Sequence, residues 1–474
     1  MPIPWLVSET RAEKMRGGSL LRLVVAIVAE AIFFAALNFF DDWTLESMPV
    51  KFVVAAFLSG IAYLVAVSGF KSEIGLRKQA SIFWSVALAL RLIALPLAPS
   101  DDLWRYQWEG KIQRAGFNPY LVAPDDPQLE QARQQFPDWE KINHRDFPAI
   151  YPPGAELLFR FCSGISDRPL FYKLLFAIAD LATIVVLLRL MRRPIATAGG
   201  ATATPGSQER ASSIYPIAAW YAWNPLVIYS FAGAAHFDSL MILPFVGGIV
   251  CLIRSASESK SSRKWVWALG GATLFGIAIS IKLVPALLLL LFVFALQWRA
   301  IVLTTSVAIP ALLSLPFGFP KVRIWDSLGQ FAHITRLNDL FWWLIEDTVW
   351  ANPHQRNYHY NVILVACVVA VSLFFIRDWK RGMLWALGTA LVLSPVLHPW
   401  YCTWILPLAT WRRAHAWHVL SITIFAYYLF WSERLFTLPW HAEPWMRALI
   451  IAPVLAALVM LAAQRKPTSQ TAIS

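Results

Sequence analysis

Apolar runs of membrane length recur along most of the chain and constrain what it can fold into. Clear examples are 20–40, 51–70 and 170–191. An α-helix rises 1.5 Å per residue, so about 20 apolar residues cross the roughly 30 Å hydrocarbon core of a bilayer. Of the 474 residues, 58% are apolar and only 15% are charged, more apolar surface than a soluble domain of this length needs. The fold is therefore predicted to be all-α, a polytopic integral membrane helical bundle.

The run 265–298 decides how the segments are counted. As one helix it would span about 50 Å, too long for one crossing. We divide it at Lys282, which predicts about 14 transmembrane helices in total. The expected segments are 20–40, 51–70, 80–98, 170–191, 214–231, 237–254, 265–281, 283–297, 299–316, 359–376, 382–397, 399–411, 415–431 and 445–463.

Basic residues predict the orientation, because they accumulate on the cytoplasmic side of membrane proteins. With this segment count, every basic cluster falls on one side: those near 11–16, 71–78, 189–193, 254–264, 377–381, 412–413 and 465–466. The net charge of +12 thus reflects the topology and not nucleic-acid binding.

The chain is accordingly expected to have three parts. They are a cytoplasmic N-terminus (1–19), a single transmembrane domain (20–463) and a disordered cytoplasmic tail (464–474). A Gly-, Ala- and Ser-rich stretch, 194–213, is typical of a flexible cytoplasmic linker. The first apolar run lacks a convincing cleavage site and is expected to be a retained anchor. No N-x-Ser/Thr sequon occurs, which favours a bacterial cytoplasmic (inner) membrane.

Two long loops, at about 99–169 and 317–358, fall on the outer side, where long ordered loops usually carry function. The first opens with Asp101 and Asp102, which stand in the first turn of a predicted helix that Ser100 can cap. This helix should run to about Ala115 and stop at Gly116. Asp101, Asp102 and Glu109 are all helical neighbours of Arg105. The array could free one carboxylate for proton transfer, or it could be only an interfacial helix with solvated charges.

Further polar residues stand at the outer ends of other segments. They are His236, Asp238, Lys282, His398, Trp400 and Tyr401, with Arg336 in the second long loop. Lys282 could meet a lipid phosphate or simply snorkel to the surface, and the aromatics could form an interfacial belt. Segment 146–161 could wall a groove for a lipid chain, or its prolines could only stiffen the loop. Arg91, inside a predicted segment, could pair with Glu30 or Asp180.

Other chemistries find no support in the sequence. The four cysteines are scattered, and no histidine has metal-ligand spacing. There is no phosphate-cradling glycine loop and no serine nucleophile elbow. Neither a metal nor a cofactor is therefore expected.

The first loop resembles a known family. An arginine in the preceding segment, then DDLWRYQWEG and GFNPY, is similar to polytopic glycosyltransferases of the C-type superfamily (GT-C) that use polyprenyl-phosphate sugars. The similarity is strongest to bacterial polyprenyl-phosphate-mannose-dependent mannosyltransferases and to the first mannosyltransferase of glycosylphosphatidylinositol synthesis. Tyr151-Pro152-Pro153, the IKLVP around Lys282 and the HPWY at 398–401 also match. The acidic pair is contiguous and follows the third segment, a departure that we attribute to an extra N-terminal hairpin at 20–70.

The resemblance implies an inverting transfer of a sugar, most simply mannose, from a polyprenyl-phosphate donor to a lipid or glycan acceptor at the outer face. Asp102, or else Asp101, would be the base. The donor phosphate would be bound by Lys282, Arg105, Arg336 and His398. The substrates would contact Glu109, Tyr120, Tyr151, His236, Asp238, Trp400 and Tyr401.

Two other classes of function stay open from the sequence alone. A polytopic transporter or lipid flippase would also use many segments with charges inside them, although no inverted repeat is visible. A non-catalytic assembly subunit would use the polar outer face only for binding.

Overall fold

A computed structural model describes residues 4–71, 75–192, 214–352, 356–431 and 443–464. The predicted linker at 194–213 and nearly all of the predicted tail at 464–474 lie outside these residues. Within them the chain is helical, and its one isolated β-bridge joins Leu337 to Val396. The prediction of an all-α polytopic membrane protein is confirmed.

Seven helical stretches of the described residues are long and apolar enough to cross a membrane. Most coincide with predicted segments: Leu20–Phe39 at the end of α1 (Pro4–Ala36) and η1 (Leu37–Phe39), α2 (Met48–Gly69), α7 (Pro169–Met191), α11 (Asp238–Ser257), α12 (Ser261–Ile281), α14 (Arg299–Ser314) with η6 (Leu315–Phe317), and most of α22 (Pro444–Gln464). An eighth candidate is α17 (Tyr358–Phe374) with η7 (Ile376–Asp378) and α18 (Trp379–Val392), bent by 77°.

The predicted number of about 14 is therefore larger than the seven or eight spans that length and composition support in the described part of the chain. The other predicted segments are α3 (Leu76–Ala94) and several short or broken helices. These are α9 (Ile214–Ala222), α10 (Pro225–Ile228), η4 (Tyr229–Gly233), η5 (Val284–Leu288), α13 (Leu289–Ala295), η8 (Pro399–Trp404), α19 (Leu406–Arg412), α20 (Ala416–Thr423) and η9 (Ile424–Leu429). Prolines begin or follow several of the breaks, because proline has no N–H to continue a helix.

The predicted break at Lys282 is confirmed. Helix α12 ends at Ile281, and Lys282 has an extended backbone with φ −152° and ψ 136°. Pro285 follows within the next short helix. The ammonium group therefore leaves the end of a span and does not sit in the middle of one.

A buried ion pair ties the middle of the bundle together. Arg91 donates to one oxygen of Asp180 through Nε at 2.8 Å and through a terminal nitrogen at 2.5 Å, and Tyr221 donates to the other oxygen. Of the two partners predicted for Arg91, the structure selects Asp180 on α7. Glu30 is buried elsewhere, where its backbone carbonyl accepts from Ser59.

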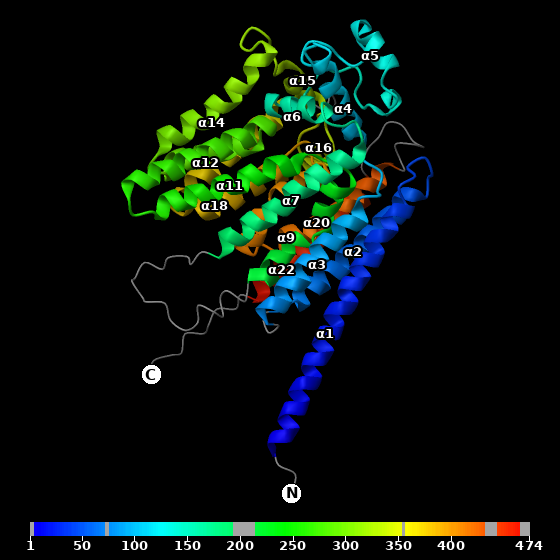
Figure 1. Cartoon of the computed structure of the whole chain (residues 1–474), viewed down its shortest axis with the longest axis vertical. Helices are drawn as coiled ribbons and strands as arrows, with labels where there is room; N and C mark the ends of the chain where they lie inside the picture. The colour runs from blue at the N-terminus through cyan, green and yellow to red at the C-terminus, as the bar shows by residue number, and fades with distance from the viewer. Residues whose placement is uncertain (1–3, 72–74, 193–213, 353–355, 432–442, 465–474) are drawn as a thin grey trace.

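The two long loops meet at one end of the bundle (Figure 1). The first contains α4 (Asp101–Arg114), η2 (Pro127–Leu129), α5 (Glu130–Gln134), η3 (Trp139–Lys141) and α6 (Pro153–Ser163), and the second contains α15 (Asp326–Ile334) and α16 (Trp342–Thr348). Asn118 in the first loop donates to the Phe317 carbonyl in the second at 2.9 Å. Helix α6 crosses the end of α12, where Gly154 packs directly on Ser280.

Helix α4 follows its prediction closely. It begins at Asp101 and ends at Arg114, and Gly116 has a left-handed backbone (φ +92°), as a helix stop requires. Ser100 occupies the N-cap position, but its side chain makes no capping hydrogen bond, so that detail was wrong. Its backbone N–H instead donates to the Ala234 carbonyl at 2.9 Å. This bond fixes the start of α4 against the turn that precedes α11.

Candidate active site

Asp102 is oriented by two neighbours and still reaches the surface. Asn143 donates to its Oδ1 at 2.8 Å, and Nδ1 of His236 lies 3.4 Å from its Oδ2. The side chain of Asp102 is 17% exposed, whereas that of His236 is 1% exposed. The carboxylate is thus held in place and remains accessible.

The local chain path explains why Asp102 and His236 meet. A π-helical turn, Tyr229–Gly233, is followed by Ala235 with a left-handed backbone (φ +62°). Such turns and strained residues are frequent at functional sites. The bond from Ser100 to Ala234 brings the first turn of α4 alongside this strained turn.

Trp400 packs against two histidines. The imidazole of His236 stacks on it with ring centroids 3.7 Å apart, and that of His398 does so at 4.3 Å. Nδ1 of His398 also lies 3.3 Å from the Tyr427 hydroxyl. His236, His398 and Trp400, which are far apart in the sequence, therefore form one cluster with Asp102.

Lys282 and Asp238 form a second charged pair close by. The Lys282 ammonium donates to Asp238 Oδ1 at 2.8 Å, and the Trp404 indole donates to the same oxygen at 2.6 Å. The ammonium also lies over the rings of Phe237, Tyr401 and Trp404, at 4.8, 5.1 and 5.3 Å from their centroids. Asp238 is fully buried, but the Lys282 side chain is 17% exposed. The Lys282 side chain is therefore partly accessible, whereas its carboxylate partner is not.

The protonation states of this cluster follow from its contacts. Burial by itself raises the pKa of Asp102, but the hydrogen bond and charge of His236, the charge that His398 gains in acid and the Asn143 amide lower that pKa below its usual range. Burial lowers the pKa of His398 to about 3, against the opposing charge of Asp102. Near neutral pH, Asp102 is therefore ionised and His398 is uncharged.

Arg105 lies beneath this cluster and is fully engaged. It donates to Glu109 at 2.5 Å and to the backbone carbonyls of Asn143, His144 and Phe147 at 3.3, 2.8 and 2.6 Å. Its side chain is only 4% exposed. Arg105 therefore holds the loop that carries Asn143, and all three of its guanidinium nitrogens already have partners within the protein.

Glu109 is likewise buried, and it faces a second carboxyl group. Burial, and then the charge of Glu109 and a hydrogen bond with it, raise the pKa of Glu156 well above its usual value. The second oxygen of Glu109 and one oxygen of Glu156 are both buried, which fits a proton shared between them. Gln113 donates to the other oxygen of Glu156 at 2.8 Å. Glu109 thus contacts Arg105 and faces Glu156, while its predicted contact with the substrate stays a prediction.

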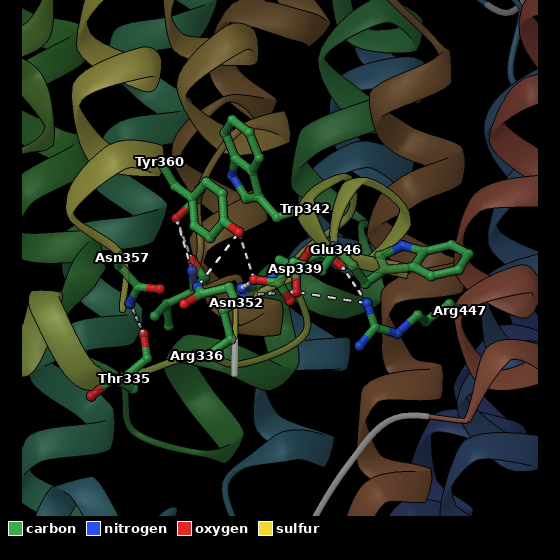
Figure 2. Close-up of polar contacts among 12 residues, drawn as sticks. Thr335, Arg336, Asp339, Trp342, Glu346, Asn352, Asn357, Tyr360 and Arg447 are labelled. Carbon is green, nitrogen blue, oxygen red and sulfur yellow. Dashed lines mark hydrogen bonds and ion pairs between the residues drawn. The ribbon is translucent and has the colours of Figure 1, made fainter. Parts of the chain in front are cut away.

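Arg336 belongs to a separate polar cluster under the second loop (Figure 2). It donates to Asp339 at 3.0 Å and to Glu346 at 2.5 Å, and its guanidinium lies over the Tyr360 ring. Arg447 from α22 approaches Asp339 at 3.6 Å. Asp339 and Glu346 therefore already pair with the guanidinium of Arg336, which was predicted to bind the donor phosphate.

The remaining predicted site residues are distributed around this end of the bundle. The Tyr120 hydroxyl donates to the Tyr151 carbonyl at 2.7 Å. This bond connects the GFNPY motif with the Tyr151-Pro152-Pro153 motif of the same loop. The Tyr151 ring packs edge-on against Phe237, beside Lys282. Asp101 is exposed on the first turn of α4.

Three residues of the cluster were missed as site candidates: Asn143, Trp404 and Tyr427. Asn143 is in an irregular loop, next to His144 with a left-handed backbone (φ +45°), and nothing local marks it. Trp404 and Tyr427 resemble the many other interfacial aromatics of this chain. Their contacts become visible only when segments from distant parts of the sequence are brought together.

One comparison with known proteins gave a match. A family model described as alpha-(1->6)-mannopyranosyltransferase, N-terminal domain, of the MptA_B family matches residues 23–299. No curated protein and no solved structure matches the chain. The matched range contains Asp102, Asn143, His236, Asp238 and Lys282, whereas the HPWY stretch lies beyond it.

Proposed function

Because this chain belongs to the alpha-(1->6)-mannopyranosyltransferase family and is a membrane glycosyltransferase of GT-C type that transfers mannose, we propose that its donor is a polyprenyl-phosphate mannose. The mannosyl group moves with inversion to a hydroxyl of a lipid or glycan acceptor. By the distribution of basic residues, the site faces the outer side of a bacterial cytoplasmic membrane, with both termini in the cytoplasm.

The observation that carries this proposal is the pairing of an oriented, accessible carboxylate with a partly accessible cation. The acceptor oxygen attacks the anomeric carbon while the bond from that carbon to the phosphate oxygen breaks. Asp102 takes the hydroxyl proton, and the polyprenyl phosphate leaves with the bonding electrons. Asn143 and His236 hold Asp102 in the ionised state that this step needs.

Inversion is supported by the burial and the hydrogen bonds of Asp238. A double displacement needs a second carboxylate as nucleophile, close to the first. Asp238 is fully buried and already accepts from Lys282 and Trp404. It is thus in no position to attack the sugar.

Lys282 is the cation that we assign to the leaving phosphate. Asp238 uses one of the three donors of this partly exposed side chain, and the other donors can meet a phosphate oxygen. When the Tyr427 hydroxyl donates to Nδ1 of His398, the ring carries its proton on Nε2. His398 is then a neutral donor for a phosphate or sugar oxygen. Asp101, Tyr151, Trp400 and Tyr401 are proposed as contacts at the rim of this site.

A transfer assay tests the proposal. Membranes containing the wild type or Asp102→Asn receive radiolabelled polyprenyl-phosphate mannose, or nucleotide-activated mannose in a parallel arm, together with lipid extract as acceptor. We expect a new labelled product only with the wild type and only from the polyprenyl donor. The isosteric amide keeps the shape of Asp102 and removes the base. Equal labelling by both proteins would exclude Asp102 as the base, and labelling from the nucleotide donor alone would exclude the proposed donor.

A further inference from the structure

A surface groove lies away from the Asp102 cluster, between the end of α4 and α6. Its volume is about 610 Å³, and it is lined by Arg114, Leu157, Arg160, Phe161, Gly164 and Ile165. Arg114 stands 12 residues after Asp102 on the same helix, a separation of roughly 18 Å along the axis. The groove is thus a different place on the molecule from the site proposed for sugar transfer.

The groove has two positive charges without partners. Neither Arg114 nor Arg160 makes an ion pair or a side-chain hydrogen bond within the described part of the chain, and both are exposed. The nearby carboxylate of Asp167 lies 3.8 Å from the Lys111 ammonium and is paired there. Two uncompensated guanidinium groups on one groove favour an anion, and guanidinium geometry suits the oxygens of a phosphate.

The walls of the groove are apolar and unusually exposed. Phe161 is 64% exposed and Ile165 is 56% exposed. Water is a poor environment for such a patch, whereas a hydrocarbon chain is a favourable one. An amphipathic helix with basic and aromatic residues is also typical of a membrane surface.

The position of the groove in the fold agrees with that environment. Helix α6 crosses the end of the membrane-length helix α12, where Gly154 packs on Ser280. At its other end, Ile165 precedes by four residues the start of the membrane-length helix α7 at Pro169. The groove therefore opens at the level where spans end, between hydrocarbon and headgroups.

Gly164 forms part of the groove wall beside Arg114. A Cβ added to Gly164 would collide with a terminal guanidinium nitrogen of Arg114. Even an alanine there would thus displace the guanidinium from its present place. The substitution Gly164→Ala should therefore displace the positive charge of Arg114 without removing it.

We propose that this groove binds an anionic glycerophospholipid of the surrounding bilayer. The lipid phosphate lies between Arg114 and Arg160, and one acyl chain lies along Leu157, Phe161 and Ile165. The bound lipid fixes α6 against the membrane surface at the end of the bundle that carries the Asp102 cluster. This binding does not depend on which sugar donor the protein uses.

The test measures lipid retention by the full-length protein. The chain is reconstituted into nanodiscs of equal parts phosphatidylglycerol and phosphatidylcholine with identical acyl chains. It is then extracted into mild detergent, and retained lipid is counted by native mass spectrometry. Each arginine near an anionic lipid is worth about a fivefold change in affinity, so Arg114→Gln with Arg160→Gln should weaken phosphatidylglycerol retention roughly 25-fold.

Two further variants make the result specific. Arg168→Gln removes another exposed arginine, which stands just before α7 and outside the groove, and this variant should retain phosphatidylglycerol like the wild type. Gly164→Ala should weaken retention while keeping both charges. The proposal is overturned if the wild type retains the two lipids equally or retains neither. It is also overturned if the double variant keeps phosphatidylglycerol, or if Arg168→Gln loses as much.

Discussion

Asn143 and Asp102, 41 residues apart in the sequence, are joined by a hydrogen bond of 2.8 Å at the mouth of the candidate active site. The backbone that carries this amide is held in place, because Arg105 donates to the backbone carbonyls of Asn143, His144 and Phe147. Glu109 in turn fixes Arg105. The orientation of the proposed base thus depends on a chain of contacts that begins two turns further along its own helix.

Replacing Asn143 by alanine should slow transfer without preventing folding. The residue is in a surface loop, and its side chain has one assigned partner, so truncation leaves no buried group behind. We expect a loss in kcat of roughly tenfold to a hundredfold, within the range that a misplaced base costs. Transfer rates in reconstituted vesicles measure this. Wild-type kcat in this variant would show that Asn143 does not position Asp102.

The Lys282–Asp238 pair should be important to stability as well as to turnover. Lys282→Met leaves a buried carboxylate with only the Trp404 indole as partner and should cost about 3 kcal/mol of unfolding free energy. Asp238→Asn added to Lys282→Met removes the stranded charge, keeps an acceptor for Trp404 and should recover most of that loss. Thermal unfolding in detergent gives both values.

Transfer activity distinguishes the structural role of Lys282, its pairing with Asp238, from its proposed role in binding the leaving phosphate. The stabilised double variant should still fail to use the polyprenyl-phosphate donor, because the cation for the leaving phosphate is missing. Full activity in the double variant would leave Lys282 with a structural role only. Arg447→Gln serves as a control for losing an ion pair elsewhere in the protein, since Arg447 pairs with Asp339 in the separate cluster of Figure 2.

The parts of the fold that local chemistry controls could be predicted from the sequence. Acidic residues at a helix start and a glycine at its stop gave the limits of α4. A lysine within an overlong apolar run gave the break after Ile281. The number of spans was predicted less well, because a proline-broken apolar segment and a straight one have similar composition.

The site itself could be predicted only in part. Residue types and their common end of the bundle pointed to Asp102, His236, Lys282 and His398, which the structure gathers. The sequence could not show that Arg105 and Arg336 are already engaged. The partners of Arg105 include backbone carbonyls, which every sequence has, and those of Arg336 depend on how the second loop folds.

The buried pair Glu109 and Glu156 should make stability depend on pH. The pKa of Glu156 is raised in the folded state by burial and by Glu109, so folding favours the protonated form. That contribution is complete below the ordinary glutamate pKa and is lost as pH rises toward the raised value. Glu156→Gln imitates the protonated acid and should show a smaller fall in Tm between pH 5.5 and pH 8.5 than the wild type.

Glu109→Gln provides the contrast. It removes the carboxylate that Arg105 needs and should destabilise the protein by about 3 kcal/mol. Because Glu109 also helps to raise the pKa of Glu156, its loss should also weaken the pH dependence. Equal Tm curves for the wild type and Glu156→Gln would contradict a shared proton.

The proposed orientation predicts which cysteines an impermeant reagent can reach. Single cysteines can replace Leu121, an exposed residue of the first long loop, and Ser259, an exposed residue between α11 and α12. The Ile281 end of α12 packs against the first loop, so Ser259 lies at the opposite end of that helix. In intact spheroplasts, a membrane-impermeant maleimide should label Leu121→Cys at once and Ser259→Cys only after permeabilisation. The four native cysteines are replaced by serine or alanine beforehand. The reverse pattern would place the site in the cytoplasm and exclude a donor on the outer leaflet.

The pH dependence of transfer should report on the contact between His236 and Asp102. Burial alone raises the pKa of Asp102, but His236 and Asn143 lower it below the usual aspartate range, so the base stays ionised in mild acid. Removing the imidazole in His236→Gln should raise that pKa, and the acid limb of the kcat profile should move to higher pH. His398→Gln should leave the limb nearer to that of the wild type, because burial keeps His398 uncharged, with a pKa of about 3. If the acid limb is the same in the wild type and in His236→Gln, Asp102 is not the group whose ionisation the reaction requires.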